Sequence, residues 1–284
     1  MKLAVAQVAS ATDRAESLQR CLEAIDGAAE RGAEAIVFAE VVLDRFFPAL
    51  PAIDGRGEAA QALAEEIPGP TTERLAERAA RHGIVVVFNL YERDGDRFYD
   101  TSPVIDADGT LLGKVRMLHV PDYPGFHETQ YYTPGDLGMP IFDTRVGKLG
   151  VAICYDRHYP EVWRALALGG AELVVIPQAG TLGEWPEGLY EGEVRTMAFQ
   201  HGVWAALANR VGKEEHAIFA GESFVVDPEG RIVARGATLE EDLLIVDIDL
   251  GRSSTSHGRR LFAADRRPEL YADFVAPDRS GSVR

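Results

Sequence analysis

The sequence predicts an α/β protein with helices on the outside of one mixed β-sheet or of two sheets. Strand-length apolar runs alternate with helical patterns early in the chain, and strands in hairpin order follow in the middle and near the end. Alternation is typical of parallel strands covered by helices, whereas hairpins join antiparallel strands. Because no linker or internal repeat divides the chain, we expect one domain over residues 1–275 and a loose polar tail over 276–284.

The first elements are indicated by the spacing of their apolar residues. A helical spacing puts Cys21 on a buried face, so we interpret this cysteine as a packing residue. Gly32 ends that helix. The elements expected in this part are strands over residues 2–8, 35–38 and 84–90 and helices over residues 14–31 and 71–82.

A hairpin and two long loops mark the rest of the chain. Strands over residues 97–106 and 110–116 are expected to flank an Asp-Gly turn, and the loop over 119–138 is of a length typical of functional segments. The remaining expected elements are strands over residues 149–153, 172–176, 203–208, 220–226, 231–235 and 243–248, helices over 160–168 and 191–201 and a second loop over 178–190.

Composition argues against several classes of function. The 284 residues carry a formal net charge of −16, and a negative field repels phosphate backbones, so we expect no nucleic-acid partner. No stretch has the length of a membrane span and the N-terminal apolar run is too short for a signal peptide, so we expect a cytoplasmic protein without a membrane partner. The two cysteines indicate no disulfide framework, and the 7 histidines show no ligand spacing, so we predict no metal site.

The stretch GKLGVAICYDRHYPE, residues 147–161, reads as a buried strand, a turn and a helix start. Asp156 can cap that helix, and Pro160 suits its first turn. At the turn, Cys154 would lie at the carboxyl end of a strand, where ligands of α/β folds gather, and beside a helix N-terminus, which favours a thiolate. A lone cysteine in a strand is more often a buried, inert thiol. The rest of the chain has to decide between these interpretations.

Three reactive side chains, Glu40, Lys114 and Cys154, each follow or end a different apolar run. Strand ends at one edge of a sheet converge, so residues that are distant in the chain can meet there. A thiol nucleophile needs a base, and a carboxylate in a desolvated pocket can serve as one. An ammonium and a backbone N–H can stabilise the oxyanion that forms. From position alone, a solvated loop acid and an ordinary surface lysine are equally open interpretations of Glu40 and Lys114.

Four motifs resemble those of the nitrilase superfamily of carbon–nitrogen hydrolases, whose signature is a Glu–Lys–Cys triad. AIVFAE resembles the motif of the base, GTLLGKVRMLHVPD that of the lysine, GVAICYDRHYPE that of the nucleophile and GFHETQYYTPGD that of a second glutamate. The resemblance covers nearly the whole chain and implies that Glu40, Lys114, Cys154 and Glu128 are catalytic. It also implies a four-layer α-β-β-α sandwich of two mixed sheets, no metal or organic cofactor, and a homodimer or larger homo-oligomer.

The chemistry implied by the resemblance is acyl transfer on a small-molecule amide or carbamoyl substrate. Glu40 takes the proton of Cys154, which attacks the carbonyl carbon and forms a thioester. The backbone N–H of Tyr155 and the ammonium of Lys114 hold the oxyanion. Glu128 positions Lys114 or the substrate, and water then releases the product.

Within the superfamily, the chain resembles the N-carbamoyl amidohydrolases. The ICYxRHxP pattern and NRVG resemble β-ureidopropionase, whose substrate ends in a carboxylate, whereas HVPDxPG and ADRRPELY resemble N-carbamoylputrescine amidase, whose substrate ends in an ammonium. Arg157 stands where carbamoyl amino acid hydrolases carry a carboxylate-binding arginine, although an ion pair inside the site or the dimer interface is an alternative role. We therefore expect an N-carbamoyl amino acid such as N-carbamoyl-β-alanine as substrate. His158, Gln178 and Trp185 are the other expected pocket residues.

Other functions share these residues. N-carbamoylputrescine amidases, aliphatic amidases and nitrilases would use the same triad, whereas a non-catalytic nitrilase-like interaction domain belongs to a different class. The presence of Glu40, Lys114 and Cys154 favours an enzyme, and the flanking residues of Cys154 do not fit a papain-type thiol hydrolase. One departure from the family concerns the substrate pocket: in VVLDRFFP, Arg45 replaces a common glycine in a loop that is expected to help line it.

Overall fold

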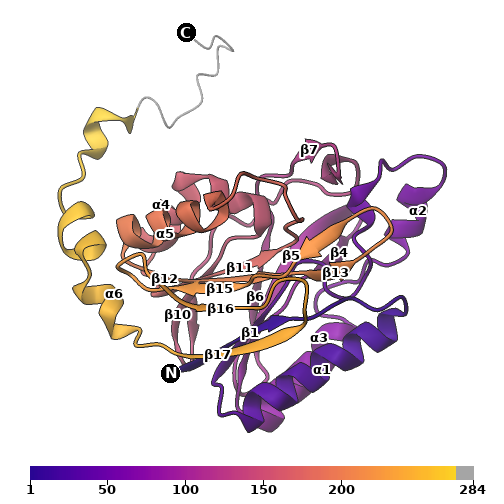
Figure 1. The fold of residues 1–284 in the computed structure, drawn as a ribbon, viewed down its shortest axis with the longest axis horizontal. Coiled ribbons are helices and arrows are strands. Elements are labelled where there is room, and N and C mark those ends of the chain that lie inside the picture. Colours follow the sequence, from indigo (N-terminus) through magenta and orange to yellow (C-terminus); the bar gives the residue numbers. More distant parts are fainter. Residues whose placement is uncertain (273–284) are drawn as a thin grey trace.

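Two β-sheets pack face to face in the middle of the molecule, and helices cover the outer face of each (Figure 1). The structure is a computed structural model that describes residues 1–272. This helix–sheet–sheet–helix order confirms the four-layer sandwich that the motifs implied. The expected tail over residues 276–284 lies outside the described residues.

The first sheet has seven strands in the order β17-β1-β2-β3-β5-β4, with β6 beside β5. Its strands β1, β2 and β3 are parallel and apolar, as is usual for strands that are buried on both faces. The strands are β1 (Lys2–Gln7), β2 (Ala35–Phe38), β3 (Val85–Val87), β4 (Leu90–Asp94), β5 (Arg97–Ile105), β6 (Leu111–Arg116) and β17 (Asp242–Asp247). Helices α1 (Arg14–Glu30) and α3 (Pro70–His82) pack on the outer face through Leu22, Ile25 and Leu75.

The second sheet has six strands in the order β16-β15-β12-β11-β10-β9. These are β9 (Phe142–Thr144), β10 (Gly147–Val151), β11 (Leu173–Gln178), β12 (Trp204–Asn209), β15 (Phe224–Val226) and β16 (Ile232–Arg235). Helices α4 (Pro160–Leu168) and α5 (Leu189–His201) cover its outer face through Trp163, Leu166 and Val194. The C-terminal α6 (Gly251–Thr255) follows β17 and leads along the side of α5 (Figure 1).

The core between the sheets brings the carboxyl ends of β2, β10 and β11 together. Val37 of the first sheet and Val151 and Val175 of the second belong to one buried apolar cluster. At the edge of this cluster the two sheets are joined directly, because the amide of Glu40 donates to the carbonyl oxygen of Gln178 at 3.4 Å. The expected convergence of strand ends is therefore formed across the two sheets.

Several element bounds differ from the expected ones. The run over residues 84–90 is divided into β3 and β4, because Asn89 is turned inward and uses its side chain to bind the backbone of Val41. The run over 220–226 is divided at Glu222, whose φ is +55°. Short elements in polar stretches were missed: α2 (Arg56–Gln61), β7 (Asp122–Tyr123), β8 (Phe126–His127), β13 (Val211–Lys213) and β14 (Ile218–Ala220).

Asp156 does not cap α4 as the sequence suggested. Tyr159 occupies the cap position and makes no side-chain cap bond. The carboxylate of Asp156 instead accepts hydrogen bonds from the amides of Leu118 and His119 and from the His119 ring. It thereby ties the segment after β6 to the segment that carries Cys154. Within residues 1–272, no helix combines the length and apolar character that crossing a bilayer requires.

Candidate active site

Cys154 lies at the turn that follows β10, as expected, and opens a short 3-10 helix over Cys154–His158. Its φ of +42° falls in the left-handed region, which favours glycine, and such conformations in other residues gather at functional turns. The side chain is only 4% exposed. Its Sγ accepts a hydrogen bond from Nε2 of Gln178 at 3.1 Å, so the end of β11 helps hold the thiol.

Glu40 is fully buried just after β2, on the facing sheet. The backbone here is held tightly: the amide of Val41 donates to Oδ1 of Asn89 at 2.6 Å, and Nη1 of Arg210 donates to the carbonyl of Glu40 at 2.9 Å. Val41 has a φ of +45°, so this turn is also strained. Neither carboxyl oxygen of Glu40 accepts a hydrogen bond from a backbone N–H or a basic side chain among the described residues. The side chains next to its carboxyl group are those of Asp100 and Cys154.

Glu128 opens the short 3-10 helix Glu128–Gln130 in the loop after β6 and is completely buried. Its carbonyl accepts from the amides of Tyr131 and Tyr132, whereas its two carboxyl oxygens lack partners within residues 1–272. Its negative charge raises the pKa of both Glu40 and Cys154. The structure thus brings Glu40, Glu128 and Cys154 into one buried cluster.

The electrostatics of this cluster favour protonated groups. Burial, reinforced by the charge of Glu128, raises the pKa of Glu40 to about 8. Burial also raises the pKa of Glu128 well above its usual range. The Cys154 thiol has a raised pKa, first because it is buried and then because Glu40 and Glu128 lie near; Arg157 acts in the opposite direction. The resting site therefore holds a neutral thiol next to a carboxyl group whose pKa is close to neutral pH, as suits a general base.

The structure does not bring Lys114 to this cluster. Side chains alternate along a strand, so Lys114 and Arg116 of β6 point to one face of the sheet while Val115 and Met117 point to the other. Lys114 donates to Glu92 on its own face, where Arg116 also binds Glu92 at 2.7 Å. Val115 and Met117 belong to the buried cluster that contains Cys154. The expected contact between the Lys114 ammonium and the oxyanion is therefore not made in this structure.

Beside Cys154 lies a cavity of about 320 Å³. Arg157 is its most buried lining residue, 1% exposed, and its Nη1 donates to the carbonyl of Cys154 at 3.0 Å and to Oε1 of Gln178 at 2.9 Å. Its guanidinium lies over the Tyr190 ring, 4.4 Å from the centroid. The cavity is lined by Tyr155, Arg157, His158, Trp185, Leu189, Tyr190 and Glu193.

The expected pocket residues have different places in this arrangement. His158 and Trp185 line the cavity, with Nδ1 of His158 at 2.7 Å from Oε1 of Glu193. Gln178 does not line it; its side chain bonds to both Cys154 and Arg157 and so helps hold the thiol in place. Tyr155 follows Cys154 and lines the cavity with its ring. The role of its backbone N–H at an oxyanion stays a prediction.

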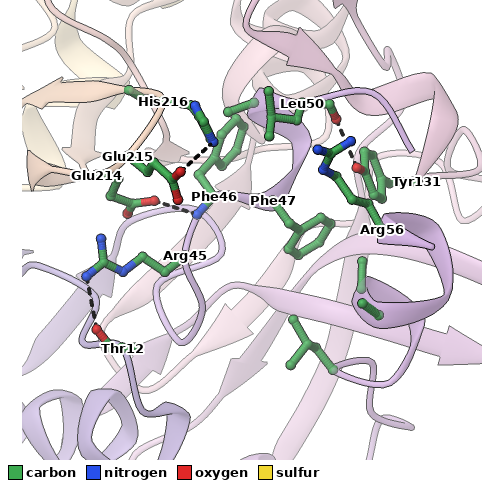
Figure 2. A pocket seen from close by; sticks show the side chains of 15 residues that line it. Thr12, Arg45, Phe46, Phe47, Leu50, Arg56, Tyr131, Glu214, Glu215 and His216 are labelled. Atoms are coloured by element: carbon green, nitrogen blue, oxygen red, sulfur yellow. Dashed lines mark hydrogen bonds and ion pairs between the residues drawn. The ribbon is translucent and has the colours of Figure 1, made fainter. Parts of the chain in front are cut away.

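The loop of Arg45 lines a different and larger cavity, of about 700 Å³ (Figure 2). In this loop the amide of Phe46 donates to Oε2 of Glu214 at 2.8 Å. Neither Glu40 nor Cys154 is among the described residues that line it. The departure at Arg45 therefore changes a surface that is separate from the cavity beside Cys154.

The sequence did not reveal every residue that shapes the site. Asn89 lies between β3 and β4, Asp100 lies in β5, and both are buried. Glu184 accepts hydrogen bonds from the hydroxyls of Tyr123 and Tyr190. A polar residue in an otherwise apolar run, such as Asn89 in residues 84–90, is a signal that could have identified Asn89. Within residues 1–272, no three His, Cys, Asp or Glu side chains are arranged to hold a metal ion.

The fold and the burial of Cys154 near Glu40 are those expected of a carbon–nitrogen hydrolase, and comparison with known proteins shows this class. The family model described as Carbon-nitrogen hydrolase matches residues 2–256. The chain belongs to this family and is an enzyme of the carbon–nitrogen hydrolase class.

Relatives of known name fall in the expected branch. N-carbamoylputrescine amidase from Solanum lycopersicum is 33% identical, over 99% of this chain and 97% of that protein. Beta-ureidopropionase from Arabidopsis thaliana is 34% identical, over 75% of this chain and 57% of that protein. The superfamily and the branch that the motifs indicated are thereby confirmed.

Solved structures of similar proteins share the fold. A carbon–nitrogen hydrolase from Helicobacter pylori G27 has a TM-score of 0.86 at 28% identity, covering 98% of this chain and 99% of that one. An amidase mutant from Nesterenkonia sp. AN1, TM-score 0.78 at 26% identity and 96% coverage of both chains, shows covalent addition of an acetamide moiety at its active-site cysteine.

Proposed function

We propose that this hydrolase removes the carbamoyl group of an N-carbamoyl amino acid, with Cys154 as nucleophile and Glu40 as base. The observation that carries the choice of substrate is a set of unused N–H donors in the cavity beside Cys154. Among the described residues, Nη2 of Arg157 and Nε1 of Trp185 are buried without hydrogen-bond partners, whereas Nε of Arg157 faces Oε2 of Glu193 at 3.4 Å. Buried donors require acceptors, and a carboxylate is the acceptor that an arginine binds best.

The acids of the same region are already in use. Glu184 accepts from Tyr123, Tyr190 and the amide of Thr181. Glu193 accepts from His158, and its Oε2 lies 3.4 Å from Nε of Arg157. A substrate ammonium would have to compete with these donors, whereas a substrate carboxylate would meet free ones. This difference supports a carboxylate at the far end of the substrate.

The reaction proceeds in two steps. Glu40 takes the thiol proton as Sγ of Cys154 attacks the carbonyl carbon, a C–S bond forms, and the backbone N–H of Tyr155 holds the oxyanion. When the oxyanion collapses, the C–N bond breaks and Glu40 returns its proton to the leaving nitrogen. Water, deprotonated by Glu40, then attacks the acyl-enzyme, the C–S bond breaks, and Cys154 regains its proton. The carbamic acid that is released loses carbon dioxide by breaking its remaining C–N bond, so the products are the amino acid, ammonia and carbon dioxide. Glu128, with two free carboxyl oxygens, binds the amide end of the substrate.

A second candidate is hydrolysis of a carbamoyl amine that ends in an ammonium, such as N-carbamoylputrescine. The observation in its favour is charge: Glu184 and Glu193 outnumber the single guanidinium of Arg157 around the cavity. The similarity to N-carbamoylputrescine amidases points the same way. Aromatic rings of Trp185 and Tyr190 would also accept a cation.

An ammonia-release panel distinguishes these candidates. It compares N-carbamoyl-β-alanine, N-carbamoyl-α-amino acids, N-carbamoylputrescine, simple aliphatic amides and nitriles, with folded Cys154→Ala as the blank. We expect the highest kcat/KM for a carbamoyl amino acid and no turnover by the variant. A tenfold or greater preference for carbamoylputrescine or a neutral amide would replace the proposed substrate, and undiminished turnover by Cys154→Ala would refute the nucleophile.

The same proposal covers the setting of the enzyme: a cytoplasmic protein in which residues 1–275 form one catalytic domain of a homodimer or larger homo-oligomer. Apolar side chains exposed on the outer helices support assembly through that layer, namely Leu168 of α4 and Leu189 and Phe199 of α5, which are 53%, 48% and 37% exposed. Sedimentation velocity measures the assembly directly, and a monomer at micromolar concentration would contradict it.

A further inference from the structure

Two further carboxyl groups, those of Asp100 and Glu128, and the phenol of Tyr132 are buried around the reacting pair, Glu40 and Cys154. Asp100 of β5 lies close enough to Glu40 for each to affect the other's pKa, and Glu128 and Tyr132 are affected by the same group of charges. Six of their side-chain oxygens have no hydrogen-bond partner within residues 1–272: Oε1 and Oε2 of Glu40, Oδ2 of Asp100, Oε1 and Oε2 of Glu128 and the hydroxyl of Tyr132.

The basic side chains near the cluster bind other groups and do not neutralise its carboxylates. Lys114 and Arg116 bind Glu92 on the other face of the sheet. Arg210 donates to backbone carbonyls, among them that of Glu40, and Arg157 donates to the carbonyl of Cys154. An unpaired buried carboxylate costs several kcal/mol of desolvation free energy, so protons are the means by which this cluster is neutralised.

Asp100 is the carboxyl group that the backbone and its neighbours hold in place. Its Oδ1 accepts a hydrogen bond from Nδ2 of Asn89, and Oδ1 of Asn89 accepts the amide of Val41 at 2.6 Å, next to Glu40. Its carbonyl accepts the amide of Met117 at 2.9 Å. With Oδ1 engaged as an acceptor, Oδ2 is the atom left to carry a proton.

We infer that Asp100 is a positioning residue of the hydrolase: its protonated carboxyl donates from Oδ2 to the Glu40 carboxylate and holds that base toward Cys154. Two carboxylates only accept and cannot bond each other, whereas one proton on Asp100 turns the same pair into an O–H···O bond. A protonated carboxyl group thereby supports the base where an ammonium was expected, since the residue of this strand end that is buried in the cluster with Cys154 is the uncharged Met117. The inference rests on the proposed role of Glu40 and Cys154.

Electrostatics support this assignment of the proton. Burial, followed by the charge of Glu40, raises the pKa of Asp100 well above its usual range. The titratable and charged groups that face the pair are Glu128, Asp156, Cys154, Tyr132 and Arg210. Of the neighbouring charges, those of Glu40 and Asp156 raise the pKa of Asp100, so the surrounding field also favours its protonated form.

The reaction then depends on opposite protonation states of two carboxyl groups: Glu40 has to be ionised and Asp100 has to be protonated. Glu40 has to lose its proton before it can accept that of the thiol, which gives the acid limb of the pH profile. Asp100 keeps its proton throughout, and losing it at high pH would place a second negative charge beside Glu40, which gives an alkaline limb. The amide of asparagine keeps a donor at this place but cannot ionise.

The test compares Asp100→Asn and Asp100→Ala by two readouts, kcat/KM against pH and the rate at which iodoacetamide alkylates Cys154 against pH. We expect Asp100→Ala to lower kcat/KM on the order of 100-fold. We expect Asp100→Asn to stay within about fivefold of the unaltered enzyme, the worth of roughly one hydrogen bond, and to lose the alkaline limb. Cys154→Ala gives the alkylation background of Cys21.

Glu92→Gln is the matched control, because Glu92 is a fully buried carboxyl on the other face of the same sheet. It should leave both pH profiles unchanged. An unaltered kcat/KM in folded Asp100→Ala, an alkaline limb that persists in Asp100→Asn, or equal inactivation by both variants would overturn the inference. If Asp100→Ala fails to fold, the Asp100→Asn profile alone decides.

Alkylation needs no substrate, so it separates this inference from the proposed function. Should the enzyme turn over none of the carbamoyl compounds while alkylation still depends on Asp100, the substrate proposal fails and the role of Asp100 stands. Should alkylation be insensitive to both Asp100 variants, the inference fails whatever the substrate is.

Discussion

At the scale of single residues, the cavity beside Cys154 is defined by which polar atoms are free. The Trp185 indole N–H is a useful probe, because this residue lines the cavity without supporting the nucleophile, whereas Arg157 does both. Arg157→Ala would therefore change the turn of Cys154 as well as the cavity.

Trp185→Phe should raise KM for carbamoyl amino acids about tenfold and leave KM for neutral amides nearly unchanged. A hydrogen bond to a charged acceptor is worth about 1.5–3 kcal/mol, and phenylalanine keeps most of the ring. Steady-state kinetics on both substrate types measure the effect. An equal rise in KM for both substrate types would show that Trp185 contributes only to the shape of the cavity and donates no hydrogen bond to the substrate carboxylate.

Individual residues also show what the sequence could and could not reveal about the site. Cys154, Glu40 and Glu128 were predicted as site residues because motifs preserve their order along the chain, and the structure brings all three together. Asp100 was not found, because it lies inside a strand and its importance depends on which groups surround it. The N–H donors of Arg157 and Trp185 that lack partners could not be predicted either, because this too depends on which groups surround them.

At the scale of elements, strand β6 accounts for the misplaced lysine. A motif gives the order of residues along the chain. The face of the sheet to which each side chain points follows instead from the alternation of side chains along the strand, once the direction of one residue is known. Val115 and Met117 are buried with Cys154, so Lys114 has to point the other way. The strand over residues 35–38 and the helix over residues 160–168 were predictable from the pattern of their apolar residues. The division of the 84–90 run was not, since it depends on the tertiary contact of Asn89.

Lys114→Met tests this placement. We expect kcat/KM to stay within about twofold of the unaltered enzyme, because the ammonium does not reach the reacting groups. The free energy of unfolding should fall by about 1 kcal/mol, since Glu92 loses one donor but keeps Arg116 and Thr101. Activity assays and urea unfolding measure the two effects. A 100-fold loss of activity in a folded Lys114→Met variant would place the lysine in the catalytic machinery.

At the scale of the whole molecule, two sets of carboxyl groups give stability opposite pH dependences. Ion pairs and hydrogen bonds lower the pKa of Glu92 and Glu65, and the stability that these groups contribute is lost as pH falls through their folded pKa values. Burial raises the pKa of Glu40, Asp100 and Glu128, so the folded state keeps protons that the unfolded chain releases above about 4.5. The stability contributed by this second set is lost as pH rises.

We therefore expect the thermal unfolding midpoint to fall between pH 6.5 and pH 8.5, a window that contains the pKa of Glu40, about 8. Scanning calorimetry at constant ionic strength measures the decline. Asp100→Asn should make the decline shallower, because one of the three protons is no longer released on unfolding. A midpoint that is constant or rises across this window would show that the cluster is not proton-loaded.

The burial of Cys154 has a consequence for the cell as well as for the reaction. Because its thiol is 4% exposed and the adjoining cavity measures about 320 Å³, only compounds of limited size can reach Cys154. A peptide bond within another folded protein cannot be delivered to such a place. The architecture itself thus works as a sieve, which lets a reactive amide-cleaving thiol circulate among proteins without becoming a protease.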